Sequence, residues 1–495
     1  MDTTTASEVA WVPTTRARLD PTGECLRDGD RAWDNAAFAA DVRRLARRLA
    51  TLGVAPGDTV AVMLPNCAEI IITMFAAWHR GAALTPVNPA LTDDEVRYQL
   101  EDSSAAVVVG DERAGALAES LGTAWVDANL VHDATDHEAA GADVPAAAGS
   151  DFALVIYTSG TTGRPKGVLL DHDNLAAMSG QVVEHLELTE ADRSLLVLPL
   201  FHANGLIVGT LSPLRAGGSV VVAPRFSPDT FWEVVELERP TYFSAVPTIY
   251  AVLDARTQRE IDTSSLRFVV CGAAPMTAEL ITRFEERFSV VLVEGYGLSE
   301  GTVASTINPL AGPRKPGTVG VALPGQEVAV VSPSGDPVPV GERGEVVIRG
   351  ANVMRGYLGK PEETAKVVRD GWLHTGDVGI LDEGGYLRIV DRIKDMIIRG
   401  GENIYPKEIE ECLYRHPAVL EAAVVGRPDP VLGEVPVAFV ATRPGRVATS
   451  EELLTHCRAS LARYKVPQDV TVLAELPKNA VGKLVKGLLR EPGGA

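Results

Sequence analysis

Short apolar segments alternate with amphipathic ones through the first part of the chain, and this alternation is the feature that most constrains the fold. Residues 59–63 and 105–109 read as buried strands, while residues 67–79 and 92–100 have the spacing of helices. Strands that alternate with helices are typical of a mostly parallel sheet flanked by helices. The sequence therefore predicts an α/β fold for this part of the chain.

The length and the later part of the sequence predict more than one domain. A chain of 495 residues exceeds what one hydrophobic core usually holds. From residue 317, short β-rich segments are separated by Gly and Pro, which predicts a small antiparallel subdomain. Beyond residue 406, helices and strands read as a compact α+β unit. With a boundary near residues 391–394, the predicted domains are 1–393 and 394–495.

Charge and cysteine content exclude several classes of partner. The formal net charge of −20 argues against nucleic acid or an anionic membrane as a general partner, so any anionic ligand needs a local cluster of cations. The five scattered cysteines show no metal-binding spacing and predict a reduced, cytoplasmic protein. The longest apolar stretch, residues 68–78, is shorter than the ~20 residues that span a bilayer, so no integral membrane segment is expected.

The stretch YTSGTTGRPKG, residues 157–167, lies between an apolar run and a helical pattern that starts at Asp171. Its small hydroxyl residues and glycines can surround a phosphate chain with N–H and O–H donors, and Arg164 and Lys166 add positive charge. It is not the common P-loop, because Pro165 stands where that pattern requires Gly. The first few residues alone would also suit a flexible connector. The predicted phosphate-binding residues are Thr158, Ser159, Gly160, Thr161, Thr162, Gly163 and Lys166.

Polar or glycine-containing turns follow three further predicted strands. LPLFHANG ends the strand at 194–198, GAAP follows the strand at 266–271, and EGYGLSE follows the strand at 290–293. Ligands of open α/β sheets bind outside the carboxyl ends of the strands, so these turns should share one site. Each turn taken alone could simply need small residues.

Together with the first stretch and with TGD, DRIKDMIIRGGENIYP and PKNAVGK, these motifs occur in the order expected of the adenylate-forming superfamily. The chain, from about residue 38 to 489, thus resembles the AMP-binding enzymes, which include acyl-CoA synthetases, peptide-synthetase adenylation domains and firefly luciferase. The GGEN sequence is more typical of acid–CoA ligases. The resemblance implies a large N-terminal domain, a small mobile C-terminal domain and two reaction steps. A carboxylate first forms an acyl-adenylate from ATP, and a thiol, usually that of CoA, then displaces AMP.

The resemblance implies ATP, Mg²⁺ and coenzyme A as cofactors, a small-molecule carboxylic acid as substrate, and four catalytic residues. Attack of one anion on another needs positive charge where their oxygens meet, and Lys483 matches the family's lysine at that point. Glu300 and Thr161 match the residues that hold Mg²⁺, and His202 matches the residue that guards the acyl pocket. Without the motifs, Lys483 would read as a solvated surface lysine and His202 as a packed core histidine.

The resemblance also assigns residues to the nucleotide and to CoA. Tyr296 would stack on adenine, Asp377 would accept hydrogen bonds from the ribose, and Arg392 would contact the ribose or a phosphate. Lys394 falls at the family's hinge, and Gly400, Gly401 and Glu402 resemble the loop that lines the pantetheine tunnel. The residues predicted to bind ATP or CoA, besides the phosphate-binding residues, are Gly272, Ala273, Ala274, Glu294, Gly295, Tyr296, Gly297, Leu298, Ser299, Asp377, Ile389, Arg392, Lys394, Gly400, Gly401, Glu402 and Lys483.

The predicted acyl pocket is apolar and mostly small. No carboxylate stands there to pair with an ammonium group, which favours a hydrophobic acid (fatty, cyclic or aryl) over an amino acid. An acyl-AMP ligase that loads a carrier protein, a member specialised in one half-reaction and a non-catalytic acyl-nucleotide binding protein stay open as alternatives, and so does a homodimer. The predicted pocket residues are Phe201, His202, Val246, Thr248, Gly272, Gly297 and Val303.

Overall fold

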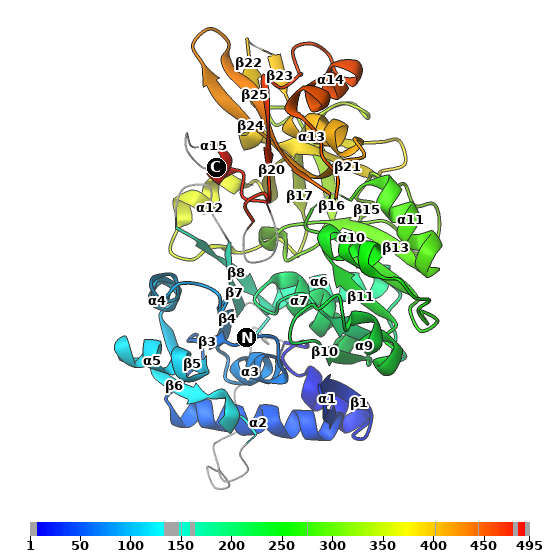
Figure 1. The fold of residues 1–495 in the computed structure, drawn as a ribbon. Helices are drawn as coiled ribbons and strands as arrows, with labels where there is room; N and C mark the ends of the chain where they lie inside the picture. The colour runs from blue at the N-terminus through cyan, green and yellow to red at the C-terminus, as the bar shows by residue number, and fades with distance from the viewer. Residues whose placement is uncertain are drawn as a thin grey trace. The chain divides into compact units, whose positions relative to one another are not determined.

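The computed structural model divides into two compact units, each described here by itself. The first unit comprises residues 1–328 and 348–374, and the second comprises residues 329–347 and 375–495. Figure 1 shows the helices and strands with the labels used below. The residues that the structure describes are 7–132, 148–149, 151–158, 164–274, 276–400, 402–443, 445–478 and 484–490.

One sheet of the first unit has the strand order β18-β8-β7-β4-β3-β5-β6. The pairs from β7 to β6 are parallel, whereas β8 and β18 are antiparallel to their neighbours. From β3 to β6 the strands alternate with helices as the sequence predicted, whereas β8 follows β7 as an antiparallel neighbour where the sequence analysis expected a helix to come next. The strands are β3 (Thr59–Met63), β4 (Ala83–Pro86), β5 (Ala105–Gly110), β6 (Ala124–Asp127), β7 (Phe152–Thr158), β8 (Lys166–Asp171) and β18 (Gly356–Tyr357).

A second sheet of this unit has the order β15-β14-β13-β12-β11-β9-β10-β1-β2. Its central pairs, from β13 to β1, are parallel, and its edge pairs are antiparallel. The strands are β1 (Glu24–Asp28), β2 (Arg31–Asp34), β9 (Arg193–Leu196), β10 (Ser219–Val222), β11 (Tyr242–Ala245), β12 (Phe268–Cys271), β13 (Val291–Tyr296), β14 (Thr306–Ile307) and β15 (Val321–Ala322).

Side chains that alternate along the strands fill cores on both faces of the second sheet. On β12, Phe268 and Val270 belong to one buried cluster, while Val269 and Cys271 belong to another that includes residues of α9, α10 and α11. Strands buried on both faces are typical of parallel sheets covered by helices. The helices are α1 (Val12–Leu19), α2 (Asn35–Thr51), α3 (Ala68–His79), α4 (Asp93–Asp102), α5 (Glu112–Ser120), η1 (Ala128–Leu130), α6 (His172–His185), α7 (Ala203–Leu206), η2 (Ile207–Leu211), α8 (Ser212–Arg215), α9 (Phe231–Glu238), α10 (Pro247–Arg256), α11 (Ala278–Phe288), η3 (Ser299–Gly301) and α12 (Pro361–Val367).

A third sheet has the order β16-β17-β20-β19, with β21 paired to β20. Its short strands confirm the predicted β-rich subdomain. Its strands β16, β17 and β20 each run from one compact unit into the other. They are β16 (Glu327–Val331), β17 (Gly344–Arg349), β19 (Val368–Arg369), β20 (Trp372–Leu381) and β21 (Leu387–Arg392).

The second unit holds a mixed sheet of order β23-β22-β25-β24, with β26 added in parallel to β25. Residues of α13 and α14 pack on one face of it, and Leu476 and Leu489 pack on the other. This is the predicted α+β unit. The elements are η4 (Ile393–Asp395), β22 (Ile397–Arg399), β23 (Glu402–Ile404), α13 (Pro406–Tyr414), β24 (Val419–Asp429), β25 (Gly433–Thr442), α14 (Ser450–Ser460), β26 (Asp469–Leu473) and α15 (Gly487–Arg490).

The boundary predicted at residues 391–394 lies inside the second compact unit. There Lys407 of α13 donates its backbone N–H to Asp391 of β21 at 2.8 Å, and its ammonium group to the carbonyl of Ile389. These contacts tie β21 to the C-terminal helices. The predicted boundary is that of a mobile domain, whereas the two compact units are defined by their internal contacts. The boundary at residues 391–394 therefore stays a prediction. Within the described ranges, no helix is long and apolar enough to cross a membrane.

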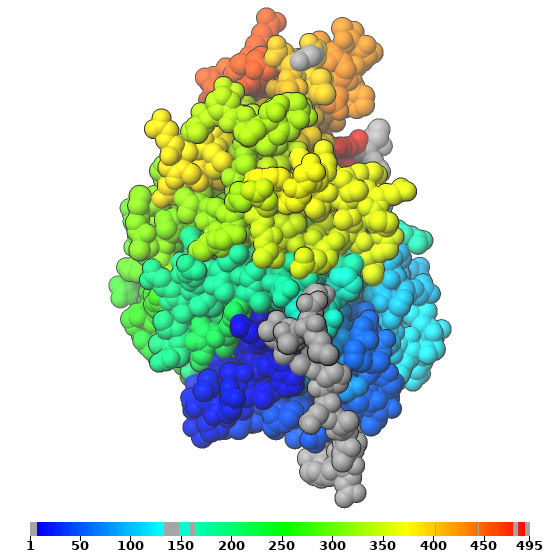
Figure 2. All heavy atoms as spheres, turned by 180° about the vertical axis from the view of Figure 1, so that it is seen from behind, coloured from blue at the N-terminus to red at the C-terminus, as the bar shows by residue number. Residues whose placement is uncertain are grey.

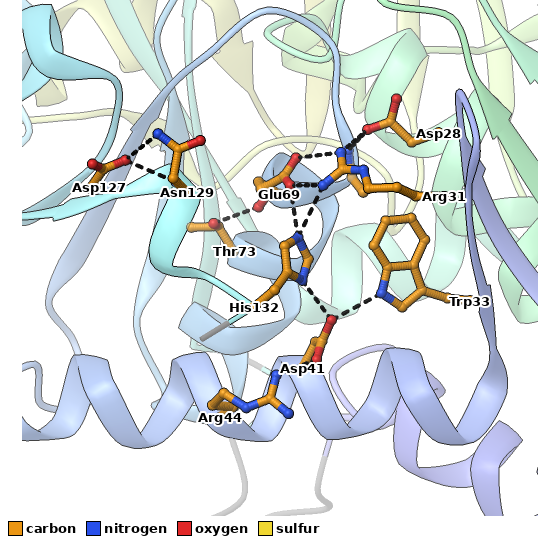
Figure 3. A network of polar contacts seen from close by, with 11 residues as sticks. Asp28, Arg31, Trp33, Asp41, Arg44, Glu69, Thr73, Asp127, Asn129 and His132 are labelled. Atoms are coloured by element: carbon orange, nitrogen blue, oxygen red, sulfur yellow. Dashed lines mark hydrogen bonds and ion pairs between the residues drawn. The ribbon is translucent and has the colours of Figure 1, made fainter. Parts of the chain in front are cut away.

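A network of charged side chains joins α2, α3 and β2 in the first unit (Figure 3). His132 places Nδ1 2.7 Å from Asp41 Oδ2 and Nε2 2.7 Å from Glu69 Oε1. Arg31 also donates to Glu69, at 2.5 Å, and Trp33 donates to Asp41, at 2.9 Å. The hydrogen bonds with Asp41 and Glu69 raise the pKa of His132 to about 9. The imidazolium therefore bridges two carboxylates at neutral pH.

Replacing this histidine tests the network through its pH dependence. We expect His132→Gln to destabilise the first unit by about 2–3 kcal/mol at pH 6.5, because two largely buried carboxylates lose a shared cation. The pKa of His132 is higher in the folded than in the unfolded chain. Its stabilising contribution is therefore full below pH ~6.5 and lost as the pH rises through about 9. Urea unfolding of both proteins at pH 6.5 and 9.5 measures this loss.

His172 provides a matched control, because burial lowers its pKa to about 4. It is neutral at both pH values, so the stability difference between the wild type and His172→Gln should not change between them. A wild-type advantage over His132→Gln that is as large at pH 9.5 as at pH 6.5 would contradict the charged bridge.

Candidate active site

The carboxyl ends of β9, β11, β12 and β13 lie along one edge of the second sheet. These strands are parallel neighbours: Phe243 pairs with Leu195, Ala245 with Cys271, and Cys271 with Glu294. The turns that follow them therefore emerge side by side, as the sequence predicted. Strand β11, which the sequence analysis did not identify, stands between β9 and β12.

The turn after β12 leaves open space beside the strand. A Cβ placed on Gly272 would come no closer than 3.6 Å to another atom, the carbonyl oxygen of Gly295. Ala273 has φ +67°, a left-handed conformation that residues with a side chain rarely adopt. Both Ala273 and Ala274 are exposed. A strained and exposed turn at a strand end is typical of ligand sites and suits the predicted place beside adenine.

At Gly297, unlike at Gly272, there is no space for a side chain. A Cβ there would lie 2.1 Å from the carbonyl oxygen of Val303 and 2.7 Å from the Cα of Ala304. The loop that follows β13 thus folds back onto Gly297, backbone against backbone. The predicted nucleotide residues Glu294, Gly295 and Tyr296 end β13, and the half-buried Leu298 and Ser299 begin this loop.

The loop after β13 is fixed by a later segment of the chain. Met354 donates its backbone N–H to the carbonyl of Glu300 at 2.8 Å, and Asn352 donates its side-chain amide to the carbonyl of Gly301 at 3.0 Å. Thr302, with φ +58°, donates its hydroxyl to the carbonyl of Asn352 at 2.5 Å. These hydrogen bonds hold a strained backbone and with it the position of Glu300.

The side chain of Glu300 is held as well. The hydroxyl of Tyr357 donates to Glu300 Oε1 at 2.8 Å. Tyr357 lies in β18, where it pairs with Val168 of β8, and is 9% exposed. Figure 2 shows the later segment, in yellow, against the teal surface of the residues around β8. Burial and then the charge of Glu300 raise the pKa of Tyr357 well above its ordinary value, so the phenol keeps its proton.

Lys166 lies next to the same ring. Its ammonium nitrogen is 5.0 Å from the ring centroid of Tyr357 and 2.8 Å from Glu363 Oε2. Thr158 at the end of β7 pairs directly with Lys166 at the start of β8. The predicted phosphate-binding residue Lys166 and the predicted metal residue Glu300 therefore both contact Tyr357.

Helix α4 anchors both ends of the glycine-rich segment. The hydroxyl of Tyr157 donates to Asp102 at 2.8 Å, and that of Tyr98 donates to the carbonyl of Pro165 at 2.9 Å. The guanidinium of Arg164 lies 5.1 Å from the ring centroid of Tyr98. The predicted phosphate-binding residues between these ends, Ser159, Gly160, Thr161, Thr162 and Gly163, lie outside the described residues.

The predicted acyl-pocket residues come from the ends of β9 and β11 and from the loop after β13. Phe201 and His202 are half-buried, with ring centroids 4.7 Å apart. Val246 is half-buried and Thr248 is exposed, both just after β11. Val303 has φ +102°, which is unusual for a β-branched residue. Except for Thr248, these side chains are partly covered, and apolar groups predominate among them.

In the second unit, the two residues predicted at the ribose are in contact. Arg392 donates Nε–H to Asp377 Oδ1 at 2.8 Å, and the two residues face each other across β20 and β21. Asp377 is 4% exposed, and its backbone N–H donates to Thr375 Oγ1 at 3.1 Å. Gly376 has φ +70° and donates its N–H to Glu345. The TGD turn is therefore rigidly held. The predicted residue Ile389 lies on the same strand as Arg392.

The predicted hinge and tunnel residues lie on short elements of the second unit. Lys394 is exposed on the 3₁₀ turn η4, between β21 and β22. Gly400 has φ +59° and donates its N–H to the carbonyl of Leu432 at 2.7 Å, and Glu402 begins β23. Gly401 lies outside the described residues.

Lys483 lies outside the described residues too, but its flanks are anchored. Lys478 and Leu484 form an antiparallel bridge, and Lys478 lies 2.8 Å from Glu421. Lys486, three residues after Lys483, pairs with Glu410 at 2.7 Å. Lys478 and Lys486, described residues on either side of Lys483, are thus attached to β24 and α13.

Sequence reasoning missed the residues that hold Glu300. Tyr357 and Asn352 lie more than fifty residues later in the chain, as their hydrogen bonds with Glu300 and Gly301 record. Their only local signal is a Gly-Tyr pair after a β-rich segment, which also fits an ordinary turn. A π-helical turn, η2, directly after α7 was also not predicted, and such turns often occur near functional sites.

The surroundings of Glu300 suit a divalent metal that is shared with substrate phosphates better than one held by protein ligands alone. Glu300 is half-buried and keeps its carboxylate oriented by Tyr357. Among the described residues, no group of three or more His, Cys, Asp or Glu could hold a metal ion. Mg²⁺ is typically held by one or two carboxylates together with substrate phosphates, which agrees with such a site.

Comparison with known proteins shows the family. The model of the AMP-binding enzyme family matches residues 14–358, and that of the AMP-binding enzyme C-terminal domain matches residues 408–483. This chain therefore belongs to the AMP-binding enzymes, the adenylate-forming superfamily that its motifs resemble.

Similar curated proteins are named as CoA ligases. The chain is 42% identical to a feruloyl-CoA synthase of an Amycolatopsis species, covering 97% of this chain and 98% of the relative. It is 37% identical to an oxalate–CoA ligase of Arabidopsis thaliana, covering 91% of each. Other relatives are named as ligases of long-chain fatty acids and of sulfoacetate. The acid–CoA ligase family is thus supported, while the acids of its members differ.

Solved structures agree with this assignment. ATP-bound MatB from Rhodopseudomonas palustris is 32% identical, with a TM-score of 0.92 and 98% coverage of both chains. O-succinylbenzoate coenzyme A synthetase from Bacillus subtilis, in complex with ATP and a magnesium ion, is 33% identical, with a TM-score of 0.87 and coverage of 96% of this chain and 98% of the other. The predicted fold class, enzyme class and cofactors ATP, Mg²⁺ and CoA are confirmed at the level of the family. The predicted hydrophobic acid, whether fatty, cyclic or aryl, is supported only in part, because relatives are also named for oxalate and sulfoacetate.

Two glycines at this edge give a direct test of its geometry. We expect Gly297→Ala to destabilise the first unit by about 2 kcal/mol or more, because the new methyl group meets backbone atoms that have no room to move. Gly272→Ala should leave stability within about 0.5 kcal/mol of the wild type, because its methyl group enters open space. Thermal unfolding compares the two variants.

The same pair separates packing from ligand binding. If the space beside Gly272 receives a ligand, Gly272→Ala should raise KM for ATP or for the acid in a stably folded protein. An equally stable Gly297→Ala would contradict the close backbone contact, and unchanged KM values in Gly272→Ala would remove this space from the site.

Proposed function

We propose that this protein is an ATP-dependent carboxylic acid–CoA ligase whose acid is hydrophobic, with an aryl acid as the first choice. The observation that carries the proposal is the row of turns at the carboxyl edge of the second sheet. There an oriented carboxylate, Glu300, belongs to the same edge as the open turn at Gly272 and the half-buried Phe201 and His202.

In the first step, a carboxylate oxygen of the acid attacks the α-phosphorus of ATP, an acyl-adenylate forms and pyrophosphate leaves. Two anions meet here, so we assign Lys483 to the reacting oxygens and Lys166, with the hydroxyls of Thr158, Ser159, Thr161 and Thr162, to the phosphates. Glu300, with Thr161, would hold Mg²⁺, which supplies further positive charge at the phosphate oxygens when it is bound. Asp377, held in place by Arg392, would accept hydrogen bonds from the ribose hydroxyls.

In the second step, the CoA thiol attacks the acyl carbonyl carbon, the bond from that carbon to the phosphate oxygen breaks, and AMP leaves. We assign the loop from Gly400 to Glu402 to the path of the pantetheine arm. Lys394, exposed on η4, suits a hinge because a short turn between two strands can absorb a change of backbone angles. Binding of adenine by Tyr296 and the turn from Gly272 to Ala274 completes the assignment.

Two observations favour a hydrophobic acid. The side chains of Phe201, Val246 and Val303 are apolar and partly covered, and the relative named as a feruloyl-CoA synthase acts on an aryl acid by that name. The names of other relatives point to small anions, oxalate and sulfoacetate. These would need an additional cation in the pocket. A small anionic acid is therefore the competing outcome of the test.

The test is acid-dependent exchange of labelled pyrophosphate into ATP, run with a panel of acids. The panel pairs ferulate and a medium-chain fatty acid with oxalate, sulfoacetate and an amino acid. We expect the aryl acid to give the highest kcat/KM, and CoA to convert the same acid to a thioester with AMP as the second product. Preference for oxalate or sulfoacetate would overturn the acid class.

The same assay separates the alternatives. Exchange without thioester formation from free CoA, but with transfer to a purified carrier protein, would identify an acyl-AMP ligase. Exchange with neither acceptor would identify a member specialised in one half-reaction, and binding of ATP without exchange would identify a non-catalytic protein. The cytoplasmic location and a homodimer stay predictions.

Lys483 gives the sharpest single-residue test of the two-step scheme. We expect Lys483→Ala to lower the rate of acyl-adenylate formation by at least ~10²–10³, because an electrostatic contact to the transition state is lost. Thioester formation from supplied acyl-adenylate should be much less affected. Single-turnover assays of each half-reaction measure the two rates, and Arg463→Ala, which removes an exposed cation of the same unit, serves as the control. Equal loss in both half-reactions of Lys483→Ala would contradict the assigned role.

A further inference from the structure

We propose that Tyr357 is a positioning residue that orients the Glu300 carboxylate for its divalent metal and couples it to Lys166. The inference rests on the proposed function, because it takes Glu300 as the metal residue of an ATP site. It adds a residue from a distant segment, the end of β18, that the reaction scheme above does not use.

The contact between Tyr357 and Glu300 favours one orientation of the Glu300 carboxylate. The Tyr357 hydroxyl donates to Glu300 Oε1 at 2.8 Å, and the ring is 9% exposed, so the phenol has little freedom to turn away. A tyrosine hydroxyl has one proton to donate, and a carboxylate can only accept it. The bond occupies one lone pair of Oε1 and fixes the plane of the carboxylate, and Oε2 takes no part in it.

The direction of the bond follows from the chemistry of its two partners. An ionised carboxylate has no proton to give, so the Tyr357 hydroxyl donates and Glu300 Oε1 accepts. A neutral donor to the carboxylate keeps the full negative charge of Glu300 available for the metal, which a lysine or arginine at this place would partly neutralise.

Backbone and side chain of Glu300 are held by the same segment. Met354, three residues before Tyr357, donates its N–H to the carbonyl of Glu300 at 2.8 Å. The backbone N–H of Tyr357 in turn donates to Thr364 Oγ1 at 2.9 Å, which attaches β18 to α12. The hydrogen bond from Tyr357 therefore comes from a firmly anchored residue, so it can hold a metal-binding carboxylate in one orientation.

The ring also contacts the predicted phosphate-binding lysine. Lys166 Nζ lies 5.0 Å from the ring centroid, within the range of a cation–π interaction. Lys166 also pairs with Glu363 on α12, at 2.8 Å. A cation over the ring withdraws electron density from the phenol and strengthens its hydroxyl as a donor. Lys166, which would bind phosphates, and Glu300, which would bind the metal on those phosphates, thus share one rigid aromatic ring.

The experiment measures metal binding without turnover. The full-length protein, saturated with a non-hydrolysable ATP analogue, is titrated with Mn²⁺ in place of Mg²⁺, and free Mn²⁺ is followed by electron paramagnetic resonance. Tyr357→Phe removes one oxygen and keeps the ring, so the fold and the contact with Lys166 should persist. We expect the Kd of Mn²⁺ to rise about tenfold, because loss of a residue that hydrogen-bonds a metal ligand usually weakens metal binding by ~10–100-fold.

Tyr250→Phe is the matched control. It removes a buried hydroxyl that donates to the carbonyl of Val270 at 2.7 Å, in the core of the same unit. It should leave the Kd of Mn²⁺ unchanged. A purely structural role of Tyr357 predicts that the two variants lose similar stability and that neither changes Mn²⁺ binding. That result would overturn the proposal.

A double-mutant cycle with Glu300→Gln tests whether Tyr357 acts through Glu300. We expect Tyr357→Phe to add less than about twofold to the Kd of Mn²⁺ in the Glu300→Gln background, because the group it orients is already impaired. The full tenfold effect in both backgrounds would show that Tyr357 acts elsewhere. An unchanged Kd in Glu300→Gln alone would remove Glu300 from the metal site, and the proposal with it.

Failure of this inference and failure of the proposed function give different results. If the wild type forms acyl-CoA but Tyr357→Phe binds Mn²⁺ normally, the ligase stands and the positioning role falls. If no acid supports pyrophosphate exchange, while Tyr357→Phe and Glu300→Gln weaken Mn²⁺ binding in the expected pattern, the positioning role stands and the ligase assignment falls.

Discussion

Parallel pairing of β9, β11, β12 and β13 brings the predicted site residues to one edge of a sheet. The loop after β13 is held there by hydrogen bonds with residues 352–357. Cys271 pairs with Glu294 across β12 and β13, so the turns that follow both strands begin at the same level. The chain then doubles back on Gly297, where backbone atoms approach too closely for any side chain. Residues 352–357 close the arrangement through hydrogen bonds to the loop.

These hydrogen bonds explain how a loop with a strained backbone can be rigid. Thr302 and Val303 both have positive φ angles, which cost free energy unless neighbouring contacts impose them. The contacts come from a segment that is itself anchored on β8 through β18. A carboxylate at the end of such a loop is oriented before any ligand arrives, which lowers the cost of ordering it when the ligand binds. In the second unit, Arg392 has the same effect on Asp377.

Much of the fold could be predicted from the sequence because its strands and helices have strong periodicity and clear turn residues. The strand before YTSGTTGRPKG, the helix after Asp171 and the turns at GAAP and YGLSE were predicted, and Asp171 caps α6 through the N–H of Asn174. The strand β8, which pairs antiparallel with β7 directly after this stretch, was not predicted. The pairing of Tyr357 with Glu300 could not be predicted, because nothing local in Gly356–Tyr357 says which loop its hydroxyl reaches. The four-residue β11 was missed for a similar reason: Tyr242–Ala245 is too short and too mixed in character to stand out. The reaction class could be predicted from the order of the motifs. The identity of the acid substrate could not, because the shape of its pocket depends on side chains from separate strands.

The central claim, that the acid reacts with ATP through an acyl-adenylate, is tested most directly by following oxygen. An acid labelled with ¹⁸O in both carboxylate oxygens is incubated with the enzyme, ATP and CoA, and the products are weighed by mass spectrometry. Because the attacking oxygen becomes the bridge to phosphorus and leaves with it, the account predicts one ¹⁸O in each AMP and one in each thioester. Label in inorganic phosphate with ADP as the nucleotide product, or unlabelled AMP, would contradict it.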